Sequence, residues 1–343
     1  MDLVTHVTDG QSWLPVAFAG LLGLSILLYV ILDGYDLGVG ILTGAVGAGE
    51  DRGHKDRMIA SIGPFWDANE TWLVLAVGLL LVAFPFAQGV VLGALYLPVA
   101  AMLAGLILRG VAFDFRAKAQ DGHRVWWDRA FFGGSALAAL SQGYMLGLYI
   151  VGFERTAANV AFSLVTAVSL VAGYAFIGAS WLILKAEGDL QRRAVRWARG
   201  TLWLVALGFV AVSVVTPLMS ERIFAKWFEL PYVVLLAPLP ATAAALFVVL
   251  HIALKALPTR TDRFAWVPFA GAIALFALGF YGLAYSFFPY VVPERMTIWE
   301  AAASDASLMI MFVGACLVLP MILGYTALSY WIFRGKAGAL RYD

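Results

Sequence analysis

Long apolar stretches separated by short charged segments repeat from one end of the chain to the other. Each stretch has about 20 residues or more, which is the length that an α-helix needs to cross the hydrocarbon core of a bilayer. The expected helices cover residues 12–34, 64–85, 88–109, 130–153, 157–184, 199–219, 231–255, 264–288 and 306–333. The pattern predicts an all-α polytopic membrane protein, with nine transmembrane helices in a single transmembrane domain of residues 1–343.

The boundary between the second and third helices needs an argument, because residues 64–109 contain no Lys or Arg before Arg109. In a helix that rises about 1.5 Å per residue, a stretch of this length is about twice as long as a bilayer is thick. Proline lacks a backbone donor and breaks helices, so we expect a break at Phe84-Pro85. This break gives nine helices instead of eight.

The distribution of basic residues supports nine helices and indicates an orientation. With the N-terminus outside, 19 of the 23 Lys and Arg residues fall in inner segments, and only Arg155, Arg222, Lys226 and Arg295 fall outside. Cytoplasmic loops are enriched in Lys and Arg, so we predict a periplasmic N-terminus and a cytoplasmic C-terminus. No Lys or Arg precedes the first apolar stretch, so we expect that stretch to be retained and not cleaved as a signal peptide.

Composition agrees with a membrane domain and excludes several other classes. Hydrophobic residues make up 62% of the chain and charged residues 13%, and the mean hydropathy is +0.85, unlike a soluble domain. A net charge of +1 gives no reason to expect nucleic acid as a partner. Cys316 is the only cysteine, which excludes an intramolecular disulfide and a CxxC redox pair.

Two pairs of acidic residues lie where lipid disfavours charge. Asp33 and Asp36 are expected near the cytoplasmic end of the first helix, and Asp67 and Glu70 near the cytoplasmic start of the second. An ionisable group in the hydrocarbon region costs about 2.5 to 3.5 kcal/mol on insertion scales, so these acids are functional candidates. The members of each pair are three residues apart, and they should share a helix face.

Two interpretations of these acids stay open. Pro64 suits a helix start, and a carboxylate in a first turn gains about 0.3 to 1 kcal/mol from the helix dipole, which would explain Asp67. Acids at a helix C-terminus oppose the dipole, so Asp33 and Asp36 are explained less well in this way. The alternative is that both pairs meet in a hydrated polar inlet from the cytoplasm.

Arg109 follows the third helix, and Asp114 lies five residues beyond it. We expect the Arg109 side chain to extend to the membrane interface. The alternatives are an ion pair with Asp114 or with an acid of the two pairs.

Histidines offer little for metal or haem binding. His6, His54 and His123 fall in the N-terminal tail and loops, and only His251 falls in an expected helix. Haem in a membrane domain usually requires paired imidazoles or thiolates, so we expect no metal site and no redox chemistry in this chain alone.

Several motifs resemble one family. They are DGYDLGVG from Asp33, GPFWDANETW from Gly63, GALYLP from Gly93, LRGVAFDFR from Leu108, FPYVVP from Phe288 and IWEAAASD from Ile298. In order and spacing they are similar to subunit II of cytochrome bd-type quinol oxidases. The resemblance covers the whole chain and is strongest before about residue 116. The short loops and the RGVAF form look most like the cyanide-insensitive branch.

The resemblance implies a heterodimer in which each subunit has nine transmembrane helices, arranged as two four-helix bundles plus one peripheral helix. Subunit I of the family carries haems b558, b595 and d and the quinol site, and subunit II ligates none of them. Subunit II scaffolds subunit I and can hold a structural quinone in an apolar cleft. Lipid and a small single-helix accessory subunit are further expected partners, in a bacterial inner membrane.

The family's proton path gives roles to individual residues. By motif match, Asp67 after Trp66 is the carboxylate that takes protons from the cytoplasm toward the oxygen-reducing haems. We extend this path to Glu70, Asp33 and Asp36, supported by Trp66, Asn69, Arg109 and Asp114. The implied reaction is oxidation of quinol by O2 to quinone and water, with protons taken from inside and released outside, without a true pump.

Two other functions stay open at this stage. A proton-coupled secondary transporter would use the four acids as a substrate site near the bilayer midplane, although we see no inverted repeat. A purely structural membrane scaffold would use Asp67 only to start a helix.

Overall fold

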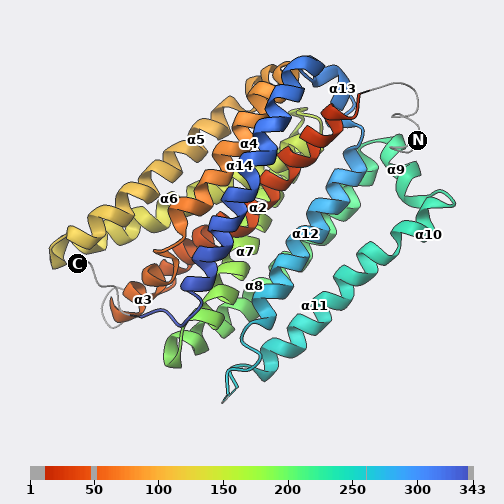
Figure 1. Ribbon diagram of the computed structural model, residues 1–343. Coiled ribbons are helices and arrows are strands. Elements are labelled where there is room, and N and C mark those ends of the chain that lie inside the picture. Colours follow the sequence, from red (N-terminus) through yellow and green to blue (C-terminus); the bar gives the residue numbers. More distant parts are fainter. Residues whose placement is uncertain (1–11, 48–51, 260, 339–343) are drawn as a thin grey trace.

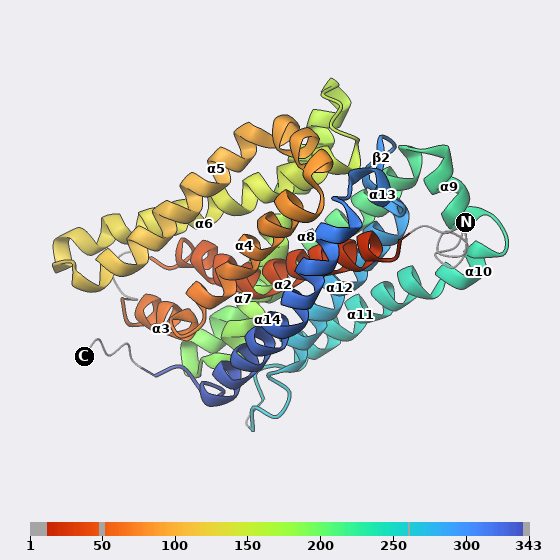
Figure 2. The same ribbon diagram turned by 45° about the horizontal axis from the view of Figure 1, so that its top comes forward.

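The computed structural model describes residues 12–47, 52–259 and 261–338, which form a bundle of long helices (Figures 1 and 2). The long helices are α2 (Leu14–Thr43), α4 (Trp66–Ala83), α5 (Pro85–Lys118), α6 (Asp121–Ile150), α7 (Ala157–Lys185), α8 (Gly188–Leu218), α11 (Pro238–Ala256), α12 (Val267–Phe287) and α14 (Asp305–Ile332). The short helices are α3 (Arg52–Ile62), α9 (Glu221–Phe228), α10 (Tyr232–Leu236) and α13 (Ile298–Ala301). Strands β1 (Tyr290–Val292) and β2 (Met296–Thr297) pair antiparallel.

Eight segments of the described residues are helical, long and apolar enough to cross a membrane. They are α2, α4, α5, α7, α8, α10 together with α11, α12 and α14. The expectation of an all-α polytopic membrane protein is therefore confirmed. Helix α6 has 30 residues and packs between α5 and α7, but it is not among the eight. Its glycines and polar residues, such as Ser141 and Gln142, make it less apolar than its neighbours.

The expected break between the second and third helices is present at Phe84. Helix α4 ends at Ala83 and α5 begins at Pro85, while Phe84 between them has φ −129° and ψ 58°, outside the helical region. Pro85 stands where its missing N–H is not needed, at the first position of a new helix.

Several helices extend beyond the apolar stretches from which they were predicted. The first was expected to end at residue 34, but α2 continues to Thr43. Helix α5 has 34 residues, about 50 Å of helix against a hydrocarbon core of about 30 Å. Helices α6 and α8 begin at Asp121 and Gly188, well before the predicted residues 130 and 199. Hydrophobicity indicates where a helix leaves the membrane. Helical hydrogen bonding continues beyond that point into the charged segments, so the helices are longer than predicted.

Ion pairs hold the charged extensions of α5 and α6 together. Arg116 is only 4% exposed, and it contacts Asp128 of α6 at 2.6 Å and Asp56 of α3 at 2.8 Å. Lys55 of α3 reaches the other oxygen of Asp128 at 3.4 Å. These ion pairs fix the short helix α3 against the charged end of the α5–α6 hairpin. They also define the position from which the chain enters α4.

Helix α2 lies in the centre of the bundle because glycines let its neighbours approach closely. A Cβ atom added at Gly38 would lie 1.8 Å from the backbone oxygen of Tyr174 in α7, and one at Gly40 would lie 2.1 Å from Oγ of Ser135 in α6. Helix α2 also packs against α4. The segment that carries Asp33 and Asp36 is therefore enclosed on three sides.

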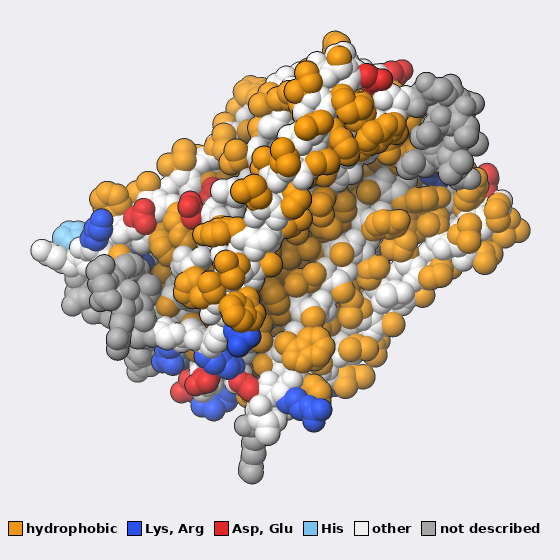
Figure 3. Space-filling view, in the orientation of Figure 1, with side chains coloured by type: hydrophobic (Ala, Val, Ile, Leu, Met, Phe, Trp, Pro, Cys, Tyr) orange, Lys and Arg blue, Asp and Glu red, His pale blue; other side chains and the backbone are white. Residues whose placement is uncertain are grey.

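The outer helices are far less enclosed. Helices α11 and α12 pack together beside α7 and α8, and α14 crosses the outside of α2 (dark blue in Figure 1). In the most apolar 18-residue stretch of α14, only 6% is buried. Figure 3, in the orientation of Figure 1, shows hydrophobic side chains along the length of the helices and charged side chains mainly near their ends. This distribution is what a bilayer requires of a surface that contacts lipid or other membrane helices.

Candidate functional site

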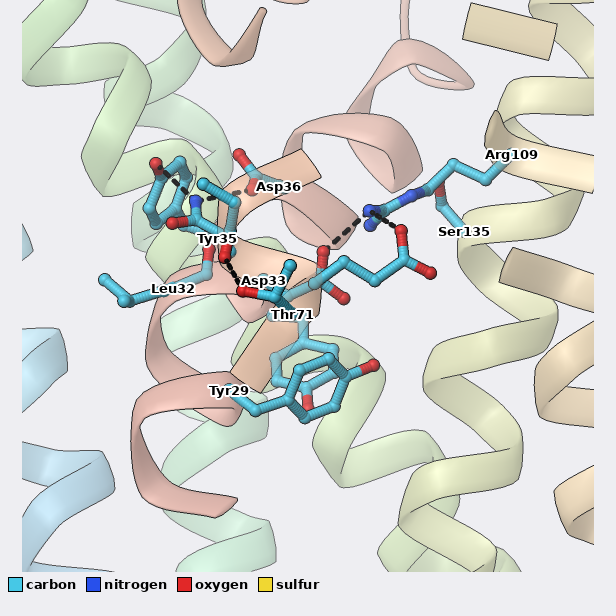
Figure 4. A network of polar contacts seen from close by, with 12 residues as sticks. Tyr29, Leu32, Asp33, Tyr35, Asp36, Thr71, Arg109 and Ser135 are labelled. Atoms are coloured by element: carbon cyan, nitrogen blue, oxygen red, sulfur yellow. Dashed lines mark hydrogen bonds and ion pairs between the residues drawn. The ribbon is translucent and has the colours of Figure 1, made fainter. Parts of the chain in front are cut away.

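The two aspartates of α2 are completely buried. Asp33 and Asp36 are each 0% exposed, and Figure 4 shows them one helical turn apart on α2. The sequence suggested that both lie near the end of the first helix. Because α2 continues to Thr43, both lie within the helix instead. Each side chain contacts a different neighbour, Asp33 on α5 and Asp36 on α4.

Arg109 of α5 points into the bundle toward Asp33 (Figure 4). Its Nη2 lies 2.7 Å from Oδ1 of Asp33 and 3.4 Å from Oε2 of Glu70, and the residue is 1% exposed. Its guanidinium also lies 5.7 Å from the centre of the Trp66 ring, a cation–π distance. The expectation that Arg109 extends to the membrane interface is wrong, and the alternative pairing with an acid of the two pairs is correct. Buried carboxylates supply the counter-charge that lipid could not.

Asn69 connects Asp36 to two tyrosines. Its Nδ2 donates to Oδ2 of Asp36 at 2.8 Å and to the Tyr35 hydroxyl at 2.9 Å. The Tyr330 hydroxyl donates to Oδ1 of Asn69 at 3.1 Å and lies 2.7 Å from the Tyr35 hydroxyl. Asn69, Tyr35 and Tyr330 thus form a closed ring of hydrogen bonds between α4, α2 and α14. We call it the Asn69 ring.

A second branch approaches Asp33 from α6 and α7, and sequence reasoning missed it. The Tyr174 hydroxyl donates to Oε1 of Gln142 at 2.6 Å, and Nε2 of Gln142 donates to the Tyr29 hydroxyl at 2.7 Å. Tyr29 precedes Asp33 by one helical turn on α2, and its hydroxyl lies beside that carboxylate. A lone glutamine in a transmembrane helix and a tyrosine one turn before an acid were the available signals.

The structure leaves two predicted residues out of this buried network. Asp67 and Asp114 are exposed, and neither joins the contacts around Arg109. Asp67 and Glu70 lie three residues apart on α4, as expected for a shared face, and only Glu70, with a side chain 28% exposed, reaches Arg109. The buried network therefore has two parts one helical turn apart on α2: Arg109 with Asp33 and Glu70, beside Trp66, and Asp36 with Asn69. 

Three polar atoms of the network are buried without a hydrogen-bond partner. They are Oδ2 of Asp33, Oδ1 of Asp36 and Nη1 of Arg109. A buried polar atom without a partner is costly; here the two carboxyl oxygens lack a donor, and Nη1 of Arg109 lacks an acceptor. Two carboxyl groups, of Asp33 and Glu70, contact one guanidinium, and carboxyl groups are the members of this network that chemically can bind and release protons.

Metal binding has less support in the part of the chain that the structure describes. No group of three or more His, Cys, Asp or Glu side chains there could hold a metal ion. His54, His123 and His251 lie on α3, α6 and α11, and His6 lies outside the described residues. These donors do not fit the paired ligation that a haem requires.

Fold and site together define a class, that of polytopic helical membrane proteins with a buried network of ionisable groups. Comparison with known proteins names the family: residues 14–333 match the family described as cytochrome bd terminal oxidase subunit II. The chain belongs to this family, as its motifs predicted. It is a multi-pass protein of the bacterial inner membrane.

Individual relatives cover nearly the whole chain. It is 30% identical to cytochrome bd ubiquinol oxidase subunit 2 of Bacillus subtilis, over 90% of this chain and 92% of the relative. It is 28% identical to cytochrome bd-I ubiquinol oxidase subunit 2 of Escherichia coli K12, over 92% and 93%. A solved structure of bd oxidase from Geobacillus thermodenitrificans has a TM-score of 0.75 at 19% identity, covering 94% of this chain and 99% of that one. This last similarity shows the fold alone.

Proposed function

We propose that this chain is the subunit of a quinol:O2 oxidoreductase that scaffolds a haem-bearing subunit I and carries protons from the cytoplasm toward the haems that reduce O2. The buried network supports the proton role, because Asp33 and Glu70 contact a single guanidinium and Asp36 is fully buried one turn further along α2. Relatives named as ubiquinol oxidase subunits support quinol, and specifically ubiquinol, as the reductant.

The haems belong to the partner in this proposal. Haems b558, b595 and d in subunit I supply the oxidation of quinol and the reduction of O2. The residues of this chain hold protons at carboxyl and hydroxyl oxygens and exclude water around them. A structural quinone and a single-helix accessory subunit stay predictions from the family, as does the cyanide-insensitive branch.

Membrane topology follows from adding α6 as a ninth transmembrane helix. The N-terminus is then periplasmic and the C-terminus cytoplasmic, and the described inner segments carry most of the basic residues; Arg260 and Arg341 lie outside the described residues. We assign α14 as the peripheral helix beside two four-helix bundles, since so little of it is buried.

Asp67 and Glu70 form the entry of the proposed proton path. Asp67 is exposed at the first turn of α4, where a proton arriving from the cytoplasm or from the partner surface can bind. Glu70 stands one turn further along α4, and it contacts the Arg109 that pairs with Asp33. The acids of α4 and α2 are therefore connected through one guanidinium. Family membership favours this role over the proton-coupled transporter.

Substitution of the entry residues in the intact oxidase complex tests the proposal. We expect Asp67→Asn and Glu70→Gln to retain the haem spectrum while quinol oxidase turnover falls at least about tenfold, as for the loss of a proton-transfer group. Asp189→Asn, at the exposed start of α8, is the matched control, and its turnover should equal the wild-type value. Full turnover in both entry variants would leave only the scaffold role.

A further inference from the structure

The two buried aspartates of α2 have different electrostatic surroundings. Asp33 faces Arg109 of α5 at 2.7 Å, with Tyr29 of α2 and Tyr174 of α7 beside it. Asp36 accepts one hydrogen bond, from the Asn69 amide of α4 at 2.8 Å, and faces the Asn69 ring. Within the described residues, no cation lies within ion-pair distance of Asp36; Arg109 acts on it only from farther away.

Hydrogen-bond directions leave the hydroxyl proton of Tyr29 available for Asp33. Oε1 of Gln142 can only accept, so Tyr174 donates to it, and Nε2 can only donate, so the Tyr29 oxygen accepts. The hydroxyl proton of Tyr29 is then left for another acceptor. Oδ2 of Asp33 is buried without a partner and needs a donor, and Tyr29 is a neighbour of that carboxyl group. The opposite orientation of the Gln142 amide would direct the Tyr29 proton to Gln142 and leave Oδ2 without one.

The charge count leaves Asp36 as the neutral acid. If Asp33, Asp36 and Glu70 were all ionised, Arg109 would contact two of the three carboxylates, and the third, Asp36, would be fully buried without a cation in contact with it. Removing an unpaired carboxylate from water is the most costly of these arrangements, so one group takes up a proton instead. Asp33 has Arg109 and the Tyr29 proton, and the Glu70 side chain is 28% exposed. Asp36 is 0% exposed and has a single N–H donor.

We infer that the two aspartates divide the work: Asp33 is the carboxylate held in an ion pair by Arg109 beside the Tyr174–Gln142–Tyr29 branch, and Asp36 is the carboxyl group that binds and releases the proton. Tyr29 and Gln142 are positioning residues that act through Asp33. This inference rests on the proposed function for its physiological meaning. The charge assignment itself can be measured without turnover.

Infrared spectroscopy of the whole oxidase complex measures which carboxyl group is protonated. Wild type minus variant spectra at neutral pH should contain the carbonyl stretch of a protonated carboxyl group for Asp36→Asn. The same band should be absent from the difference spectrum of Asp33→Asn. Loss of the band in Asp33→Asn, or in neither variant, would overturn the assignment.

Tyr29→Phe keeps the test decisive where Asp33→Asn does not assemble. Without the Tyr29 proton, Asp33 loses its second donor, so a second protonated-carboxyl band should appear while the haem content stays unchanged. Tyr144→Phe on α6, a half-buried tyrosine outside the network, is the matched control and should leave the spectrum unchanged. An unchanged spectrum in Tyr29→Phe would remove Tyr29 from its positioning role.

Turnover of the same variants separates the inference from the proposed function. If Asp36→Asn loses the band and also loses proton uptake and turnover, both hold. If the band disappears while turnover is unchanged, Asp36 is the neutral acid but the proton path does not use it. If the band is retained, the assignment is wrong whatever the turnover.

Discussion

Single residues decide whether the interior of this bundle can hold charge. Sequence reasoning identified Asp33, Asp36 and Glu70, because acids within apolar stretches are conspicuous. It left the partner of Arg109 open, since a residue at a helix end can extend outward or inward and only tertiary packing decides between them. Gln142 was missed because one uncharged polar residue does not change the hydrophobic pattern of a helix.

Removal of the guanidinium should be among the most damaging single changes. Arg109→Met leaves Asp33 buried without its cation, and breaking a buried pair in this way typically costs about 3 to 5 kcal/mol. We expect a lower thermal unfolding temperature of the purified complex. The double variant Asp33→Asn/Arg109→Met should recover part of the loss, because neither charge then remains alone. Additive losses in the double variant would argue against a direct pair.

The Asn69 ring can be tested with one hydroxyl group. Tyr330→Phe removes the donor to Asn69 and the partner of Tyr35, and we expect a loss of about 1 kcal/mol in unfolding free energy. Tyr325→Phe on the exposed side of the same helix is the control and should have little effect. Denaturant titration of both variants compares them directly.

At the scale of helices, apolar length predicted which segments are helical, and proline predicted where α4 gives way to α5. Apolar length did not predict that α2 continues through Gly34 and Gly38 to Thr43. Glycines and acids in a row resemble a loop when sequence is considered alone. Here the glycines provide contact with α7, and the acids find partners on α4 and α5, so tertiary contacts stabilise helix where local preference would end it.

Contact between α2 and α7 depends on the absence of a side chain at position 38. Gly38→Ala would place a Cβ atom 1.8 Å from the Tyr174 oxygen, so the helices must separate, and we expect little assembled complex in the membrane. Gly20→Ala, where a Cβ atom meets nothing within 4 Å, should leave the amount unchanged or raise it slightly. Haem content of isolated membranes measures both. Normal assembly of Gly38→Ala would show that α2 and α7 can move apart freely.

Lys185 fixes the C-terminal end of α14. Its Nζ donates to the backbone oxygens of Phe333 at 2.5 Å and Gly335 at 3.0 Å, at the negative end of the helix dipole. We expect Lys185→Met to expose this segment to trypsin, with faster cleavage after Arg334 in inverted membrane vesicles. Lys255→Met, at the end of α11, serves as the control. Equal cleavage rates in the two variants would contradict a role for Lys185 in holding α14.

For the whole molecule, the sequence predicted the class and the family, while the ninth transmembrane helix and the orientation stay predictions. Helix α6 shows why, since a helix with buried glycine, serine and glutamine is less apolar than one that faces lipid. The orientation of the chain in the membrane depends on the distribution of charged residues and on the insertion process, and helix packing alone reveals neither.

Cysteine labelling in intact cells tests the orientation. Because Cys316 is the only cysteine, Cys316→Ala provides a background in which Glu154→Cys and Glu187→Cys report on two exposed loops. With a periplasmic N-terminus, a membrane-impermeant thiol reagent should label position 154 in intact cells and position 187 only after the cells are broken. The reverse pattern would invert the topology.

Tyr330 gives the outermost helix a connection to the most protected part of the protein. Its hydroxyl makes hydrogen bonds of 2.7 Å to Tyr35 and 3.1 Å to Asn69, which complete the Asn69 ring beside Asp36. A displacement of α14 by about 1 Å directly away from Tyr35 and Asn69 would stretch both beyond the usual hydrogen-bond range. Any contact that displaces α14, such as one with a neighbouring lipid chain, therefore also changes the surroundings of the Asp36 carboxyl group, which is completely buried.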